Sequence, residues 1–149
     1  MTSFGRFPVT TTPDTTPLLK GPVRSAIDLL QGAHPSTTLR VVPDAQGGAW
    51  IEMLDVPFGP PYAQGSSFVI FLLPFNLPGS DIYPFFIRPD FTRADGAALG
   101  PGFQPTQLSW PGDSASRPVL QVSRRTRGAF ATQTAPHKVA KVLDWIRAQ

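Results

Sequence analysis

The chain has 149 residues, a formal net charge of +3 at pH 7 and a hydrophobic fraction of 41%, which fits one globular domain. It contains no cysteine, so disulfides, thiolate metal sites and cysteine nucleophiles are excluded, and two histidines, His34 and His137, are too few and too distant for a metal cluster. No glycine-rich phosphate loop precedes a helix. We therefore expect neither a metal nor a cofactor.

The sequence also predicts where the protein works. No apolar run approaches the roughly 20 residues that cross a bilayer. The N-terminus lacks the basic and apolar regions of a secretion signal. We expect a cytosolic protein that does not bind a membrane.

Residues 1–22 hold six threonines and four prolines without any hydrophobic periodicity, which predicts a mobile N-terminal arm. Residues 23–149 are predicted to form a single domain. Its first element is a short helix over Val23–Gly32, with Val23, Ile27 and Leu30 on one face and Gly32 as its end.

Three strand-like runs follow, separated by Gly/Pro clusters that favour hairpins: Thr38–Val42, Ala49–Val56 and Ser66–Leu73. The second run alternates between apolar and polar residues, as a sheet with one wet face requires. The third is apolar on both faces, which predicts a central strand.

The next part of the chain is rich in proline. Prolines at 78, 84 and 89 predict at best an edge strand over Phe85–Arg88. Residues 92–113 are predicted to be mostly irregular, and loops of this length usually carry function. Arg117–Val122 is then a last short strand.

A C-terminal amphipathic helix is the clearest element of the sequence. Thr134 is a good N-cap, Pro136 suits the first turn, and an apolar stripe follows at Val139, Val142, Leu143 and Ile146. We predict a helix over Ala135–Ala148. The order of elements predicts an α+β fold in which helices pack on one side of an antiparallel meander sheet.

This order and several local strings resemble the ubiquitin-conjugating fold superfamily, and within it a bacterial branch called prokaryotic family E. The matching strings are "IFLLPFNLPG" (Ile70–Gly79), "YPFFIRPDF" (Tyr83–Phe91), "GPGFQP" (Gly100–Pro105), "VSRR" (Val122–Arg125) and "KVLDWIRAQ" (Lys141–Gln149). The resemblance covers about Trp50 to Gln149. It implies a ubiquitin-conjugating-like fold, and as partners a ubiquitin-like protein and the activating enzyme of the same pathway.

The resemblance also singles out Ser123. In the better-known members, the strand after the irregular loop carries the cysteine that holds the modifier as a thioester. Ser123 occupies that place here, and Arg125 stands where the bacterial branch pattern has histidine. The implied activity is acceptance of the modifier's C-terminus as an oxyester on Ser123, followed by transfer to an amine.

A serine hydroxyl needs activation to act as a nucleophile. Arg124 and Arg125 are predicted to stabilise a developing oxyanion. Asp113, across the loop, and His137, at the start of the last helix, are the candidate bases, and their spacing in the sequence does not choose between them.

Three other interpretations stay open. The first is a catalytically inactive homologue that binds a ubiquitin-like protein, in which Ser123 merely ends a strand. The second is a serine introduced in place of a native cysteine. The third is a nucleic-acid-binding module that uses the cluster of Arg117, Arg124, Arg125 and Arg127, although no aromatic residues interleave with these arginines.

Overall fold

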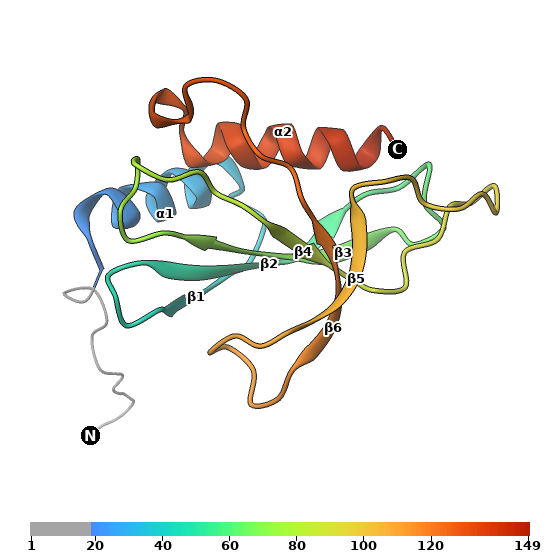
Figure 1. The fold of residues 1–149 in the computed structure, drawn as a ribbon, viewed down its shortest axis with the longest axis horizontal. Coiled ribbons are helices and arrows are strands. Elements are labelled where there is room, and N and C mark those ends of the chain that lie inside the picture. Colours follow the sequence, from blue (N-terminus) through green and yellow to red (C-terminus); the bar gives the residue numbers. More distant parts are fainter. Residues whose placement is uncertain (1–18) are drawn as a thin grey trace.

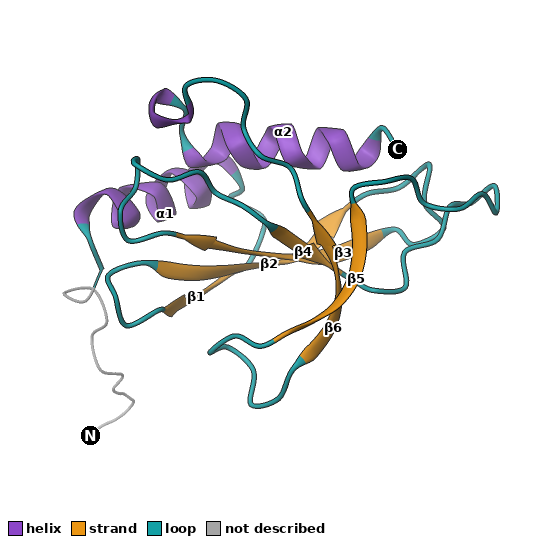
Figure 2. Cartoon of the chain, in the orientation of Figure 1, coloured by secondary structure: helices purple, strands orange, loops and turns teal. Residues whose placement is uncertain are grey.

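The computed structural model of the protein describes residues 19–149 and has an α+β fold (Figure 1). Within these residues, six antiparallel strands form one sheet in the order β1-β2-β3-β4-β6-β5, and both α-helices lie on the same face of it (Figure 2). The elements are α1 (Gly21–Ala33), β1 (Leu39–Pro43), β2 (Ala49–Pro57), β3 (Ser66–Leu73), β4 (Phe85–Ile87), β5 (Phe103–Leu108), β6 (Arg117–Val122), the short 3-10 helix η2 (Phe130–Thr132) and α2 (Ala135–Arg147).

The predicted first helix is confirmed as α1, with different ends. Pro22 lies in its first turn, where a missing N–H costs no helical hydrogen bond. Gly32 does not end the helix, because His34 still donates its backbone N–H to the Leu30 carbonyl. Gly21 and Pro22, which were predicted to end the arm, belong to this helix, and residues 1–18 lie outside the described part of the chain.

The predicted hairpins β1–β2 and β2–β3 are also confirmed, and β3 is central. Helix α2 agrees with its prediction to within one residue. The Thr134 hydroxyl accepts a hydrogen bond from the backbone N–H of His137, and the whole predicted apolar stripe is buried.

The prediction for the proline-rich segment is wrong in its position within the sheet. Strand β4 is not an edge strand, because it pairs with β3 on one side and with β6 on the other. Pro84 and Pro89 flank this strand instead of interrupting it. The backbone groups of its three residues are therefore free to form hydrogen bonds with the strands on both sides. All three side chains are buried.

Residues 92–113 are mostly irregular, as predicted, but they contain one strand that was not predicted. Strand β5 lies within them and pairs with β6 at the edge of the sheet. Pro105 is tolerated because an edge strand needs only every second backbone N–H for its single ladder. The predicted last strand is confirmed with the same ends as β6.

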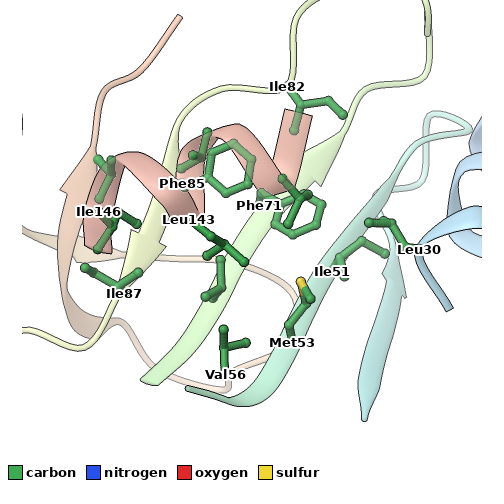
Figure 3. Close-up of a cluster of buried hydrophobic side chains, with 14 of the residues drawn as sticks. Leu30, Ile51, Met53, Val56, Phe71, Ile82, Phe85, Ile87, Leu143 and Ile146 are labelled. Carbon is green, nitrogen blue, oxygen red and sulfur yellow. The ribbon is translucent and has the colours of Figure 1, made fainter. Parts of the chain in front are cut away.

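Hydrophobic residues cover both faces of the sheet. On the helix side, residues such as Leu30, Phe71, Phe85 and Ile146 form one continuous cluster (Figure 3). On the opposite face, a smaller cluster consists of Ile70, Phe86, Leu108, Trp110 and Val119. This second cluster explains why β3 and β4 are apolar on both sides.

A buried ion-pair network borders the smaller cluster. Glu52 is only 3% exposed and accepts hydrogen bonds from Arg40 at 2.9 Å and Arg117 at 2.7 Å. Arg117 also binds Asp113, and Arg40 donates to the Gly112 carbonyl. The β5–β6 loop thus folds over the outer face of the sheet as far as β1.

Two phenylalanines test which side chains hold the fold together. Phe71 on β3 is fully buried, whereas Phe75 in the following turn is 45% exposed. We expect Phe71→Ala to lower the free energy of unfolding by about 3–5 kcal/mol. The matched control Phe75→Ala should lower it by less than about 0.5 kcal/mol. Denaturant unfolding measures both, and equal losses would contradict this packing.

Candidate functional site

Ser123 directly follows β6, and its side chain is half-buried. Its backbone N–H donates to the Gly102 carbonyl at 3.4 Å, which keeps the chain beside β5 for one residue beyond the ladder. The Gln121 amide lies 3.2 Å from the Ser123 hydroxyl and donates to it. The hydroxyl also interacts with the phenol of Tyr83, and this interaction is the largest cause that lowers the pKa of that phenol. Ser123 is therefore a positioned side chain at the end of a strand.

Tyr83 is the site residue that sequence reasoning missed. Phe85 of β4 pairs with Val122 of β6 in an antiparallel register. Continuing this register beyond both strands puts Tyr83 opposite Arg124, and so between Ser123 and Arg125. The signal was the Tyr-Pro string itself, but only the pairing of β4 with β6 shows which segment it faces.

The two arginines after Ser123 point to different neighbours. The Arg125 guanidinium lies 4.4 Å from the centre of the Tyr83 ring and also contributes to lowering the pKa of the phenol. The Arg124 guanidinium lies 4.6 Å from the centre of the Trp145 ring on α2. Arg125 thus belongs to the immediate surroundings of Ser123, whereas Arg124 extends toward the C-terminal helix.

The structure places the two candidate bases elsewhere. Asp113 accepts hydrogen bonds from Arg117 and Trp110 at the beginning of β6. A strand of this length separates it from Ser123 by roughly 20 Å. The pKa of Asp113 is lowered, first by its hydrogen bond to Arg117, which makes it a weaker base.

His137 is exposed in the first turn of α2, where its backbone N–H donates a hydrogen bond to the Thr134 hydroxyl. Its side chain lines a shallow depression together with Thr126, Arg127 and Lys141. Among the described residues, no hydrogen bond joins His137 to Ser123. Neither predicted base is therefore brought next to the hydroxyl.

A buried polar network holds the segment that follows Ser123. Lys138 of α2 is 2% exposed, and its ammonium donates to the Arg124 carbonyl and the Thr126 hydroxyl, both at 2.9 Å, and to Asp81 at 3.4 Å. Asp81 in turn accepts from the backbone N–H of Thr126 at 2.6 Å and from its hydroxyl at 2.9 Å. Gln133 completes the network. Breaking such a buried pair typically costs about 3–5 kcal/mol.

The charges of this network affect the titration of both partners. Burial acts to raise the pKa of Asp81, but the hydrogen bonds from Thr126 and the charge of Lys138 outweigh it, so the pKa lies below its ordinary value. Burial lowers the pKa of Lys138, and the nearby charge of Asp81 opposes that shift. The sequence contained a signal for this lysine, since Lys138 shares the apolar stripe of α2 with Ala135 and Val142.

A groove of about 400 Å³ begins directly after Ser123, between residues 124–127 and α2. Most of its charged lining is positive. It is lined by Arg124, Arg125, Thr126, Arg127, Lys138, Lys141, Val142, Asp144 and Trp145. Such a groove attracts anionic ligands.

Two further features of residues 19–149 bear on function. Nowhere in this part of the chain do three side chains of the metal-binding types gather. No helix within it has the length and apolar character needed to cross a membrane.

Comparison with known proteins adds no relative to this description. A scan against protein-family models, a search of curated proteins and a search of solved structures each give no match to this chain.

The surroundings of Ser123 predict an unusual tyrosine titration. The chain has two tyrosines. The pKa of Tyr83 is lowered by its hydrogen bonds to Ser123 and Arg125, whereas burial raises that of Tyr62. We expect two separate steps in an ultraviolet absorbance titration, one below and one above the ordinary value near 10.

Three variants assign these two steps. In Tyr83→Phe the lower step should disappear. In Ser123→Ala it should move upward, because the principal hydrogen bond to the phenol is lost. The matched control Ser114→Ala, at an exposed serine of the β5–β6 loop, should change neither step. A lower step that stays in place in Ser123→Ala would contradict the contact.

The buried network predicts how stability depends on pH. Because the pKa of Asp81 is lowered in the folded protein, the unfolded chain takes up this proton at a higher pH. The stabilisation is therefore present above pH about 4 and is lost as the pH falls further. Unfolding transitions measured across the acid range should show a shallower slope for Asp81→Asn than for the wild type. Ser114→Ala, in the exposed β5–β6 loop, should retain the slope.

Proposed function

We propose that the protein is a carrier in a bacterial ubiquitin-like conjugation pathway, and that it accepts the C-terminus of the modifier as an oxyester on Ser123. The observation that carries this proposal is the position of Ser123 at the end of β6, beside Tyr83 and Arg125, where the strand opens onto a basic groove. The strings that resemble the ubiquitin-conjugating superfamily, and the order of helix, meander, strand and C-terminal helix, support it.

In this function Tyr83 replaces Asp113 and His137 as the base. The Ser123 oxygen attacks the carbonyl carbon of the modifier's thioester on the activating enzyme and forms a C–O bond. The C–S bond breaks, and the serine proton passes through the Tyr83 oxygen to the leaving sulfur. Arg125, which contacts Tyr83, stabilises both the phenolate and the tetrahedral oxyanion.

The second step returns the site to its starting state. An amine of the target attacks the ester carbonyl and forms a C–N bond, the C–O bond breaks, and a proton of the amine passes through the Tyr83 oxygen to Ser123. An oxyester is less reactive toward amines than a thioester, so the positions of Gln121, Tyr83 and Arg125 around the ester must supply part of the rate.

A second function is favoured by a different observation. Among the described residues, Ser123 has no hydrogen bond to a carboxylate or an imidazole, the usual partners of a nucleophilic serine. This arrangement suits an inactive homologue that binds a ubiquitin-like protein without forming a bond to it.

Intact-protein mass spectrometry separates the two functions. The protein is mixed with ATP and with the activating enzyme and ubiquitin-like protein encoded by its genomic neighbours. We expect an adduct of one modifier that resists thiol reductant and is lost in alkali. It should be absent in Ser123→Ala and should form about 10²-fold more slowly in Tyr83→Phe, because the base is missing.

Ser114→Ala is the matched control and should form the adduct at the wild-type rate. If partners that are demonstrably active give no adduct, the carrier function is wrong and the binding function remains. An adduct that persists in Ser123→Ala would contradict the assigned nucleophile.

A further inference from the structure

The cations of the groove differ from most other arginines of the protein in what they contact. Arg40, Arg88, Arg93, Arg117 and Arg147 each lie within 4.0 Å of a carboxylate. Within residues 19–149, Arg124, Arg125, Arg127 and Lys141 form no such ion pair, although all four line the same groove. Lys138 differs from these four because it is buried and its charge is neutralised by an ion pair with Asp81.

The groove contains little negative charge to balance these residues. Its single lining carboxylate is Asp144, which is mostly exposed and lies 3.9 Å from Arg147. Arg124 and Arg125 lie over aromatic rings, so their side chains are positioned without being neutralised. These four uncompensated cations, three from residues 124–127 and one from α2, attract a ligand that carries more than one negative charge.

The dimensions of the groove limit how much of a ligand it contacts. Along α2 it extends from Lys138 to Trp145. At a rise of 1.5 Å per residue this is about 10 Å. An extended peptide advances about 3.3 Å per residue, so the groove accommodates about three residues.

From this charge and length we propose that the modifier's tail is acidic: aspartate or glutamate side chains lie among the last few residues before its terminal glycines. This inference rests on the proposed function, because it places the terminal carboxyl group at Ser123. The acidic side chains then lie beside Arg127 and Lys141. A modifier with a basic tail is repelled by the same cations, so the groove selects between modifiers.

A nucleic acid is the other anionic polymer to consider, and the groove fits it less well. Single strands bind through aromatic side chains on which bases stack. Trp145 is the one aromatic residue that lines this groove among the described residues, and Arg124 and Phe103 already stack on it. The site therefore offers charge without a free stacking surface.

Fluorescence anisotropy with short labelled peptides tests the inference directly. Three peptides share a Gly-Gly carboxyl terminus, and the two preceding residues are acidic, neutral or basic. At low salt, about 50 mM, we expect the acidic peptide to bind at least about tenfold more tightly than the neutral one, and the basic peptide more weakly still. A single-stranded oligonucleotide of similar charge should bind more weakly than the acidic peptide.

Charge reversals locate the binding. Arg127→Glu and Lys141→Glu should each lower the affinity for the acidic peptide by about tenfold or more. The matched control Lys20→Glu, exposed just before α1, should change the affinity less than about twofold. Ser114→Ala, in the exposed β5–β6 loop, should bind the peptide as the wild type does.

The outcomes separate this inference from the function on which it rests. If the protein binds the acidic peptide most tightly but forms no adduct, the preference of the groove for acidic tails is supported and the carrier function is overturned. An adduct that forms equally well with acidic, neutral and basic tails would leave the carrier function standing and overturn the inference. Equal affinity for all three peptides, or tighter binding of the oligonucleotide, would also overturn it.

Discussion

The three-residue strand β4 is the constraint on which the rest of the structure depends. It joins the β1–β3 meander to the β5–β6 hairpin, and prolines on both sides keep it short. Phe85 and Ile87 point into the helix-side core, and Phe86 points into the cluster on the opposite face. A strand this short fixes one register, since a shift by one residue would exchange the two faces.

The candidate site follows from that register. Because Phe85 pairs with Val122, the chain before β4 runs alongside the chain after β6. This brings Tyr83 opposite Arg124, between Ser123 and Arg125, and, further out, Asp81 opposite Thr126. Lys138 then ties both segments to α2. The same sheet pairing therefore positions the hydroxyl, its phenol partner and one wall of the groove.

The elements that were predicted best are those that depend on a local pattern in the sequence. The C-terminal helix was predictable because Thr134, Pro136 and the apolar stripe are near one another in the chain. The position of β4 was not, because prolines were counted as interruptions when they in fact mark the ends of the strand. Strand β5 was missed because the glycines that precede it and Pro105 within it hide an edge strand that needs few backbone donors.

The candidate site was predicted only in part for the same reason. Ser123, Arg124 and Arg125 are consecutive, so sequence identified them together. Asp113 was assigned by its position in a loop, but the strand between it and Ser123 holds the two apart. Tyr83 and Lys138 reach the site through pairing and packing between distant segments, which a single sequence does not show.

The proline that concealed β5 has a consequence for how the protein behaves in a crowded solution. An exposed edge strand offers a row of free backbone groups on which a second molecule can extend the sheet and begin to aggregate. Pro105 removes one of those donors from the middle of β5, and Pro101 and Pro111 stand just beyond its two ends. The residues that made the strand hard to recognise also keep its open edge from templating strands of other chains.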